Sequence, residues 1–364
     1  MTSPLVTSSP LQNTMQSLLN QLVADGRERG AQVAVYHRGK LVADVWAGVA
    51  DPATGREVNG ETLFPVFSVS KGMAATVIHR LVDRGLLSYD RPIAEIWPEF
   101  GVNGKEKITL RQALNHTSGI FQMPEEAELE TTCDWEKMCQ LVAQLMPVFP
   151  PGTKAQYHAI TFGWIIGEPA CRVTGLSFPE LLQREVTDPL GLGDSLYIGI
   201  PRDRHPDVAV LEHQIDPPVA KPGPQSVTAK LGTLHEMMNR RELQEACIPA
   251  TSGVMSARAV ARHYAALLPG GVDGIALLSP ARVREITTVR ESEPAEINHV
   301  LGYGLHGERA AVGRPALAFG HGGHGGSVGF TDMANHYAVG YTRNRFDDGE
   351  CPGLILEEIK KALS

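Results

Sequence analysis

The stretch that decides the fold of this chain reads Phe67-Ser68-Val69-Ser70-Lys71, and a strongly apolar segment follows it at once. In that segment apolar side chains stand at positions 74, 77, 78, 81 and 82, which is the period of a helix packed into a core, and Gly85 predicts its end. Residues three apart share one face of a helix, so Lys71 can reach the hydroxyl of Ser68. The same period sets both side chains beside the apolar stripe, and we therefore expect Lys71 to lie near the core.

A serine and a lysine in this relation predict acyl-transfer chemistry. The hydroxyl of a serine is a poor nucleophile until a neighbour takes its proton, and a lysine in a dry pocket can do so. The start of a helix also offers backbone N–H groups to a developing oxyanion. Because a pattern of two fixed positions recurs by chance, the alternative is a helix N-cap at Ser68 or Ser70 followed by a solvated lysine.

The composition is that of a globular protein. The 364 residues suffice for one large domain or two ordinary ones, and 43% of them are apolar and 20% charged. A net charge of −8 gives no reason to expect nucleic acid or an anionic membrane as a partner. No apolar run approaches the roughly 20 residues that span a bilayer, and residues 1–12 lack the basic and apolar regions of a signal peptide. We therefore expect a cytoplasmic protein without a membrane span, of open oligomeric state.

The cysteines predict neither a disulfide framework nor a metal site. Their number is odd, no Cys-x-x-Cys occurs, and their spacing fits no zinc site. The five residues are Cys133, Cys139, Cys171, Cys247 and Cys351. We expect buried free thiols in a reducing compartment.

Strand patterns stand at the two ends of the chain and helical patterns in the middle. Residues 31–36 and 41–46 read as strands joined by a tight hairpin, and residues 316–319, 327–332 and 336–341 read as strands near the other end. The region from 91 to about 250 is mostly helical, with one helix over 160–173 that Gly175 stops. Strands and helices do not alternate, which argues against a doubly wound parallel sheet.

This order predicts an α+β fold. An antiparallel sheet from the N- and C-terminal segments would be flanked by helices, with a mainly helical domain inserted between them. The sheet domain would comprise residues 1–90 and 250–364, and the helical domain residues 91–249. A cleft where the two meet would be the usual place for a ligand site.

Four segments, taken in order, carry a resemblance to a known family. The chain resembles the serine β-lactamase and penicillin-binding-protein superfamily, and most of all the class C β-lactamase-related carboxylesterases called family VIII. The resemblance implies a β-lactamase-like fold. The segments are Phe67 to Gly72, Ile108 to Gly119, Pro150-Pro151-Gly152-Thr153 with Tyr157, and Phe319 to Ser327.

The resemblance implies three motifs. Besides Ser68-x-x-Lys71, a Tyr-x-Asn element falls at Tyr157-His158-Ala159 and a Lys-Thr-Gly strand at His321-Gly322-Gly323. Ala159 and His321 therefore replace an asparagine and a lysine that lactamases use to hold the amide and the carboxylate of a β-lactam. These departures favour an esterase.

The family also implies roles for the neighbours of Ser68. A phenol near a lysine ammonium can have its pKa lowered, so Tyr157 is expected as a base. The oxyanion hole would consist of the N–H groups of Ser68 and His324, and a substrate carbonyl would approach Gly322 and Gly323 closely. His321 would orient a substrate oxygen or the tyrosine, or would only cap the strand. His116, in a turn that is structural in the family, receives no chemical role.

A second motif competes for the nucleophile. Gly325-Gly326-Ser327-Val328-Gly329 matches the Gly-x-Ser-x-Gly of α/β-hydrolases. That fold needs an acid and a histidine on later strands, and the short tail offers only Asp332 and His336 with no room for the remaining sheet. We therefore do not expect Ser327 to be the nucleophile. His321 and His324 lack a third ligand, so no metal is expected.

Together these observations predict a serine hydrolase that cleaves a small carboxylic ester. Ser68 would form the acyl-enzyme, Lys71 and Tyr157 would act as general base and acid, and no cofactor would be needed. Three alternatives stay open: an acyltransferase or transesterase with the same acyl-enzyme, a β-lactamase or D-amino-acid peptidase, and a non-catalytic binding protein on the same scaffold.

Overall fold

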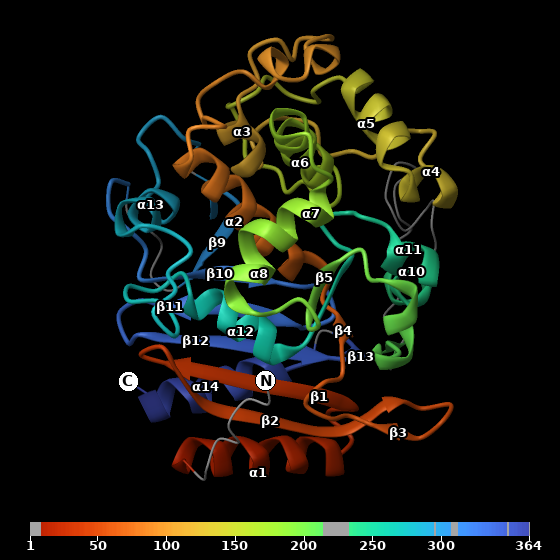
Figure 1. Ribbon diagram of the computed structural model, residues 1–364, viewed down its shortest axis with the longest axis vertical. Helices are drawn as coiled ribbons and strands as arrows, with labels where there is room; N and C mark the ends of the chain where they lie inside the picture. The colour runs from red at the N-terminus through yellow and green to blue at the C-terminus, as the bar shows by residue number, and fades with distance from the viewer. Residues whose placement is uncertain (1–8, 214–232, 295, 307–311, 348, 364) are drawn as a thin grey trace.

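An antiparallel sheet at the centre of the molecule joins the two ends of the chain. The computed structural model describes residues 9–213, 233–294, 296–306, 312–347 and 349–363. The sheet has eight strands in the order β3-β2-β1-β12-β11-β10-β9-β8. Strand β1, from the N-terminal segment, pairs with β12, from the C-terminal segment, with Ala31 opposite Arg343 and His37 opposite Tyr337. The predicted α+β fold, with a sheet from both ends of the chain, is confirmed (Figure 1).

The described elements have the following bounds. The strands are β1 (Gly30–His37), β2 (Lys40–Asp51), β3 (Arg56–Glu57), β4 (Phe64–Pro65), β5 (Leu196–Ile198), β6 (Glu212–His213), β7 (Gly253–Met255), β8 (His299–Val300), β9 (Tyr303–His306), β10 (Ala318–Gly322), β11 (Val328–Asp332), β12 (Tyr337–Arg343) and β13 (Arg345–Phe346). The helices are α1 (Pro10–Ala24), α2 (Ser70–Asp83), α3 (Leu110–Leu114), α4 (Leu129–Cys133), α5 (Trp135–Gln144), α6 (Phe162–Thr174), α7 (Phe178–Leu182), α8 (Asp188–Leu190), α10 (Leu234–Asn239), α11 (Arg241–Glu245), α12 (Ala257–Ala265), α13 (Pro280–Ile286) and α14 (Cys351–Leu363).

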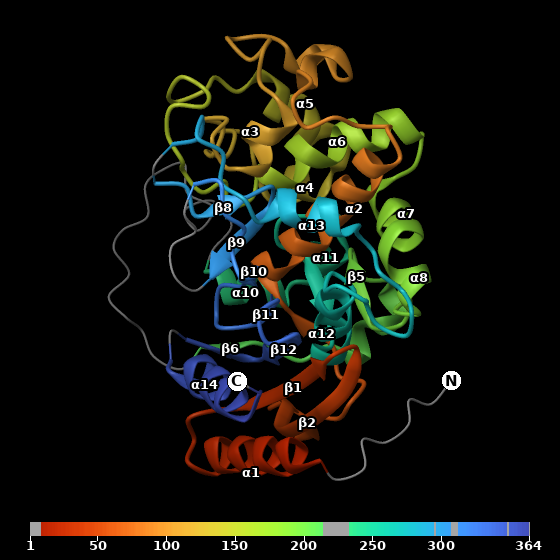
Figure 2. The same cartoon turned by 90° about the vertical axis from the view of Figure 1, so that its left-hand side faces the viewer.

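The sheet buries both of its faces. Helices α1 and α14 cover one face, and α12 covers the other (Figures 1 and 2). Because side chains alternate along a strand, Val33 and Val35 of β1 pack with Leu19 of α1, whereas Ala34 and Tyr36 belong to the larger core on the other side. The near-continuous apolar run of β1 follows from this double burial.

Two glycines let α12 lie directly on the sheet. A Cβ atom at Gly340 would come within 2.1 Å of the carbonyl oxygen of Ala257, and one at Gly329 within 2.4 Å of Val260. Side chains at these two positions would push the helix away, so the close packing depends on their absence.

The helices of the middle region lie at the end of the molecule opposite α1 (Figures 1 and 2). In Figures 1 and 2, α3, α5 and α6 lie around α2 on the side away from α1. A small sheet, β4-β7-β5, ties this region to the rest, since β5 pairs with β7. The division into residues 1–90 with 250–364 and residues 91–249 stays a prediction.

Two glycines in the sequence correctly predicted where helices end. Helix α2 ends at Asp83, two residues before Gly85, whose φ is 71°, and α6 ends at Thr174, directly before Gly175 in the left-handed region. Within the described ranges no helix is long and apolar enough to cross a bilayer.

Candidate active site

Ser68 lies in a strained turn ahead of a buried helix. Residues Phe67–Val69 form a 3-10 turn, η1, and Phe67 has a φ of 49°, a left-handed conformation that is rare for a bulky residue. Strain of this kind costs about 1–3 kcal/mol and persists only where the surroundings fix it. The hydroxyl of Ser70 fixes it here, because it donates to the Phe67 carbonyl at 2.5 Å and accepts the Gly253 N–H at 2.9 Å. The ring of Phe67 also packs against Phe346, with 5.4 Å between centroids.

The alternative of a simple helix cap does not hold. No side chain caps the start of α2, and the hydroxyl of Ser70 serves the turn instead. Lys71 is not solvated either, because its side chain is fully buried. The expectation that it lies near the core is confirmed.

The amine of Lys71 is aimed at Ser68. Its Nζ lies 3.0 Å from Ser68 Oγ, 2.7 Å from the Ala159 carbonyl oxygen and 2.8 Å from the Ala250 carbonyl oxygen. Carbonyl oxygens only accept, so two N–H bonds are committed to them. The third direction faces a hydroxyl, which accepts from an ammonium and donates to the lone pair of a neutral amine.

Burial decides which form of Lys71 is favoured. It lowers the pKa of Lys71 well below its usual range, because desolvation disfavours the charged form. The neutral amine, with its lone pair toward Ser68, is the form that can take the proton of the hydroxyl.

Tyr157 lies next to Ser68 and Lys71. Its phenol is hydrogen-bonded to Ser68, and Lys71 Nζ stands over its ring at 4.9 Å from the centroid. Burial raises the pKa of Tyr157, and the hydrogen bond with Ser68 only partly offsets this. The expected lowering of the Tyr157 pKa is therefore wrong in direction, because a buried phenolate beside a neutral amine has no charge to stabilise it. Burial thus favours the protonated phenol of Tyr157.

Three histidine rings enclose Tyr157. The ring centroids lie 4.7 Å from Tyr157 for His116, 5.4 Å for His299 and 6.1 Å for His321. Burial lowers the pKa of each, that of His299 to about 4, and all three are neutral near pH 7. The phenol is thus held by uncharged rings.

Two of these histidines were given no role by the sequence. His116 adopts a φ of 60°, and its Nδ1 accepts the N–H of His158 at 3.1 Å, so the predicted structural turn also positions Tyr157. His299 comes from the short strand β8 and belongs to no motif, so no pattern in the sequence signals it. Only the pairing of β8 with β9 and of β9 with β10 brings it to the site.

The third predicted motif lies at the end of β10. A Cβ atom at Gly323 would come within 2.2 Å of the Val66 carbonyl oxygen, so this glycine lets the strand end pack against the segment that carries Ser68. Gly322 is exposed, and a Cβ there would meet only Val328, at 3.8 Å. His324 follows the last pair of the β10–β11 ladder, and its ring packs against Phe346 at 5.1 Å.

Ser327 has the surroundings of a structural residue. It is buried, its hydroxyl accepts the Arg343 N–H at 3.3 Å, and its carbonyl accepts the Gly323 N–H at 2.7 Å. Asp332 binds Asn335 in the turn after β11. Within the described residues no catalytic partner stands against Ser327, in agreement with the prediction that it is not the nucleophile.

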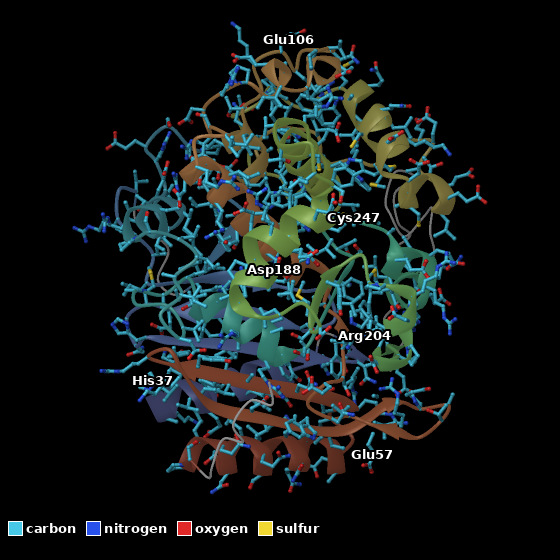
Figure 3. All side chains as sticks on the ribbon, viewed as in Figure 1. His37, Glu57, Glu106, Asp188, Arg204 and Cys247 are labelled. Atoms are coloured by element: carbon cyan, nitrogen blue, oxygen red, sulfur yellow. The ribbon has the colours of Figure 1, made fainter. Side chains whose placement is uncertain are left out.

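The structure offers no metal centre in the part of the chain that it describes, where no group of three or more His, Cys, Asp or Glu side chains could hold an ion. The five cysteines are free, and two of them are buried while three are partly exposed. Cys247, labelled in Figure 3, lies between α11 and β7.

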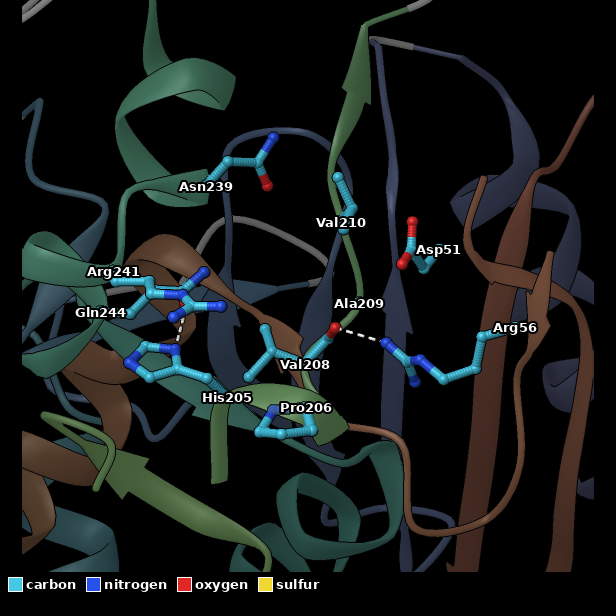
Figure 4. A pocket seen from close by; sticks show the side chains of 10 residues that line it. All are labelled: Asp51, Arg56, His205, Pro206, Val208, Ala209, Val210, Asn239, Arg241 and Gln244. Carbon is cyan, nitrogen blue, oxygen red and sulfur yellow. Dashed lines mark hydrogen bonds between the residues drawn. The ribbon is translucent and has the colours of Figure 1, made fainter. Parts of the chain in front are cut away.

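A hollow of about 250 Å³ lies between the end of β2 and α11, away from the predicted catalytic residues (Figure 4). Its polar groups are largely paired with one another. Arg56 donates to the Val208 carbonyl at 2.6 Å, and His205 binds Gln244 at 3.0 Å. Ser68, Lys71 and Tyr157 do not line it.

The family model described as beta-lactamase matches residues 15–362. Over 338 residues the chain is 36% identical to the esterase/beta-lactamase LipL of Mycobacterium tuberculosis. The match covers 87% of this chain and 77% of that protein. A family VIII carboxylesterase crystal structure is similar with a TM-score of 0.86 at 32% identity, over 98% of both chains. A penicillin-binding protein homologue from Caulobacter crescentus is similar with a TM-score of 0.83 at 31% identity, again over 98% of both chains.

Proposed function

The chain belongs to the beta-lactamase family, and on that premise we propose that it cleaves carboxylic esters through an acyl-enzyme on Ser68. The family resemblance read from the sequence is confirmed, and relatives named as esterases place the chain among serine hydrolases. One observation carries the proposal. The buried amine of Lys71, committed to two carbonyls, turns its remaining direction to the hydroxyl of a partly exposed serine 3.0 Å away.

In the first step Ser68 Oγ forms a bond to the ester carbonyl carbon while its proton passes to Lys71 Nζ. The carbonyl becomes an oxyanion, which the backbone N–H groups of Ser68 and His324 would stabilise. The contact of Gly323 with Val66 supports this arrangement, because it fixes the start of the His324 segment against the turn that carries Ser68.

In the second step the bond from the carbonyl carbon to the alcohol oxygen breaks. Tyr157, protonated in the resting site, gives its proton to the departing alkoxide and regains one from the Lys71 ammonium. Water then attacks the acyl carbon and loses its proton to Lys71. The bond from that carbon to Ser68 Oγ breaks, and Ser68 Oγ takes a proton from the Lys71 ammonium. The cycle needs no metal or cofactor.

The departures from the lactamase motifs support an ester as the substrate. Ala159 offers Lys71 its carbonyl oxygen but has no side-chain amide for a β-lactam. His321 is buried and neutral where a lysine would hold a carboxylate. Both losses weaken recognition of a lactam more than attack on an ester.

Covalent labelling tests the proposal. Wild-type protein is treated with a fluorophosphonate and measured by intact mass spectrometry, in parallel with turnover of a p-nitrophenyl ester panel. We expect one adduct and ester turnover, both lost in Ser68→Ala. Ser327→Ala is the matched control, and we expect it to keep both, although its fold must be checked because Ser327 is buried.

Each alternative has its own signature in the same experiment. Loss of the adduct in Ser327→Ala with retention in Ser68→Ala would reverse the assignment of the nucleophile. Nitrocefin turnover that rivals that of short esters would support a lactamase, and competition by excess alcohol or amine would reveal acyl transfer. No adduct and no turnover in the wild type would support a binding protein.

A further inference from the structure

The ring of Phe346, in the short strand β13, contacts both chain segments that would supply the oxyanion hole. One donor would be the N–H of Ser68 in the turn η1, and the other the N–H of His324 after β10. The centroid of the Phe346 ring lies 5.4 Å from that of Phe67, the residue before Ser68, and 5.1 Å from that of His324. The rings of Phe67 and His324 are 6.4 Å apart, edge to face. All three separations lie in the range of about 4.5–7 Å in which ring pairs attract each other.

Phe346 also packs directly against the backbone that follows His324. A Cβ atom at Gly325 would come within 2.5 Å of Phe346 Cδ2, so this backbone lies on the face or edge of the ring. Any shift of the ring would therefore be felt by the chain next to the His324 N–H.

Elements outside the site fix the position of Phe346. The residue is 8% exposed, and it shares a small apolar cluster with Phe67, Leu211 and Met238. Strand β13 pairs with β6, which lies directly after Leu211 in the sequence. The ring is thus held from behind while it contacts the two segments of the site.

The spacing of the two N–H groups matters more for the transition state than for the bound ester. Donors of an oxyanion hole act when both lie about 2.7–3.1 Å from the oxygen on which charge develops. A misplacement of about 1 Å can cost roughly 100-fold in rate. The Ser68 turn and the His324 segment are far apart in the sequence, so only contacts between them can set this spacing.

We propose that Phe346 is a positioning residue for the oxyanion hole. Its ring contacts with Phe67 and His324 set the spacing between the two backbone N–H groups. The inference rests on the proposed esterase function and adds a residue that lies outside every motif of the sequence. Because the ring acts through its neighbours, its loss should weaken binding of the tetrahedral oxyanion and leave binding of a planar carbonyl nearly unchanged.

Hydrolysis of p-nitrophenyl butyrate gives the first test. In Phe346→Leu, which keeps an apolar side chain and removes the ring, we expect kcat/KM to fall roughly 10-fold to 100-fold. Phe346→Tyr, which keeps the ring, should recover most of this loss. Circular dichroism shows whether each variant is folded.

Two ketones separate positioning from a general structural role. With propyl trifluoromethyl ketone, Ser68 Oγ bonds to the carbonyl carbon, its proton passes to Lys71, and the carbonyl oxygen becomes an oxyanion, so Ki reports on the oxyanion hole. Propyl methyl ketone has a similar shape and stays planar. In Phe346→Leu the Ki of the trifluoromethyl ketone should rise by about the factor by which kcat/KM falls, and the Ki of the methyl ketone should stay the same.

Variants of His324 test the same contact without risk to the fold, because this side chain is exposed. His324→Ala keeps the N–H and removes the ring that packs on Phe346, so it should raise the Ki of the trifluoromethyl ketone alone. His324→Phe, which restores a ring without an imidazole, should recover most of the loss. The double variant Phe346→Leu/His324→Ala should lose less than the product of the two single effects, because both remove one contact.

Phe330→Leu is the matched control. It removes a half-buried ring from β11 that packs against Tyr337, 6.0 Å between centroids, and it should change neither Ki nor kcat/KM. An equal loss in Phe330→Leu would assign the effect to loosening of the sheet and would overturn the proposal.

Failure of the positioning role is distinguishable from failure of the esterase function. A folded Phe346→Leu variant with the kcat/KM of the wild type overturns the positioning role, and so does an equal rise of Ki for both ketones. If Phe346→Leu does not fold, an unchanged Ki of the trifluoromethyl ketone in His324→Ala overturns it. In each of these cases turnover that Ser68→Ala abolishes leaves the esterase intact. If the wild type shows neither ester turnover nor a fluorophosphonate adduct, the proposed function falls and this inference falls with it.

Discussion

Two fully buried basic side chains, Lys71 and Arg343, have different partners, and their pKa values shift in opposite directions. Arg343 lies 2.8 Å from a carboxylate oxygen of Glu28, with both side chains wholly inaccessible, and 2.9 Å from Asp347. The hydrogen-bonding contacts of Lys71 are two carbonyls and a hydroxyl. Burial alone would lower both pKa values, but Tyr341, Glu28 and Asp347 hold the pKa of Arg343 above its usual range. Arg343 is thus paired with carboxylates, whereas the hydrogen-bonding partners of Lys71 are uncharged.

The largest expected effect comes from removing the amine of Lys71. In Lys71→Met we expect kcat/KM for esters to fall by about 10²–10⁴-fold, because general base catalysis is lost while the apolar stem is replaced. Steady-state kinetics on the ester panel measure this, and circular dichroism confirms the fold. Activity within a few-fold of wild type in a folded variant would move the role of base to Tyr157.

Removing the charge of Arg343 should lower the stability of the protein and leave its activity toward esters intact. In Arg343→Met we expect the free energy of unfolding to fall by about 3–5 kcal/mol, because Glu28 is left as a buried charge without its cation. Urea denaturation measures the loss, and the fraction that stays folded should still turn over ester. The double variant with Glu28→Gln should recover part of the stability, and the absence of any recovery would show that packing dominates.

The sequence predicted the position of Lys71 better than it predicted the groups around it. The 3.6-residue period over residues 74–82 sets Lys71 beside Ser68 and near the core, because both follow from one helix. The partners of Lys71 do not follow, since the Ala159 and Ala250 carbonyls come from loops whose approach depends on the whole fold. The sequence did not predict the place of His299 in the site for the same reason, since only strand pairing brings it there.

The predicted direction of the Tyr157 pKa shift was wrong for a related reason. The sequence suggested a phenol beside a charged lysine, which would lower the pKa. In the fold, burial favours the neutral form of both groups, and neutral histidine rings complete the enclosure. Proximity along a motif is readable from sequence, whereas the depth of burial is a property of segments that meet only in three dimensions.

The smallest expected effect is a gradual change of folding stability with pH. It tests the contrast between Lys71 and Arg343 directly. Because burial lowers the pKa of Lys71 in the folded state, the unfolded chain binds more protons at this residue below its ordinary pKa of about 10.4. The contribution of Lys71 to stability therefore rises with pH across that window. Lys71→Met lacks this dependence, so the stability of the wild type relative to the variant should rise between pH 6 and pH 10.

Urea denaturation of both proteins between pH 6 and pH 10 measures the slope, and kcat/KM of the wild type over the same range should rise as Lys71 loses its proton. The rising limb should lie well below the ordinary lysine pKa, because the same folded group governs both curves. A stability difference that does not change with pH would mean that Lys71 stays charged in the fold, as Arg343 does. The contrast between the two cations would then lie in their neighbours alone, and Ser68 would need Tyr157 to take its proton.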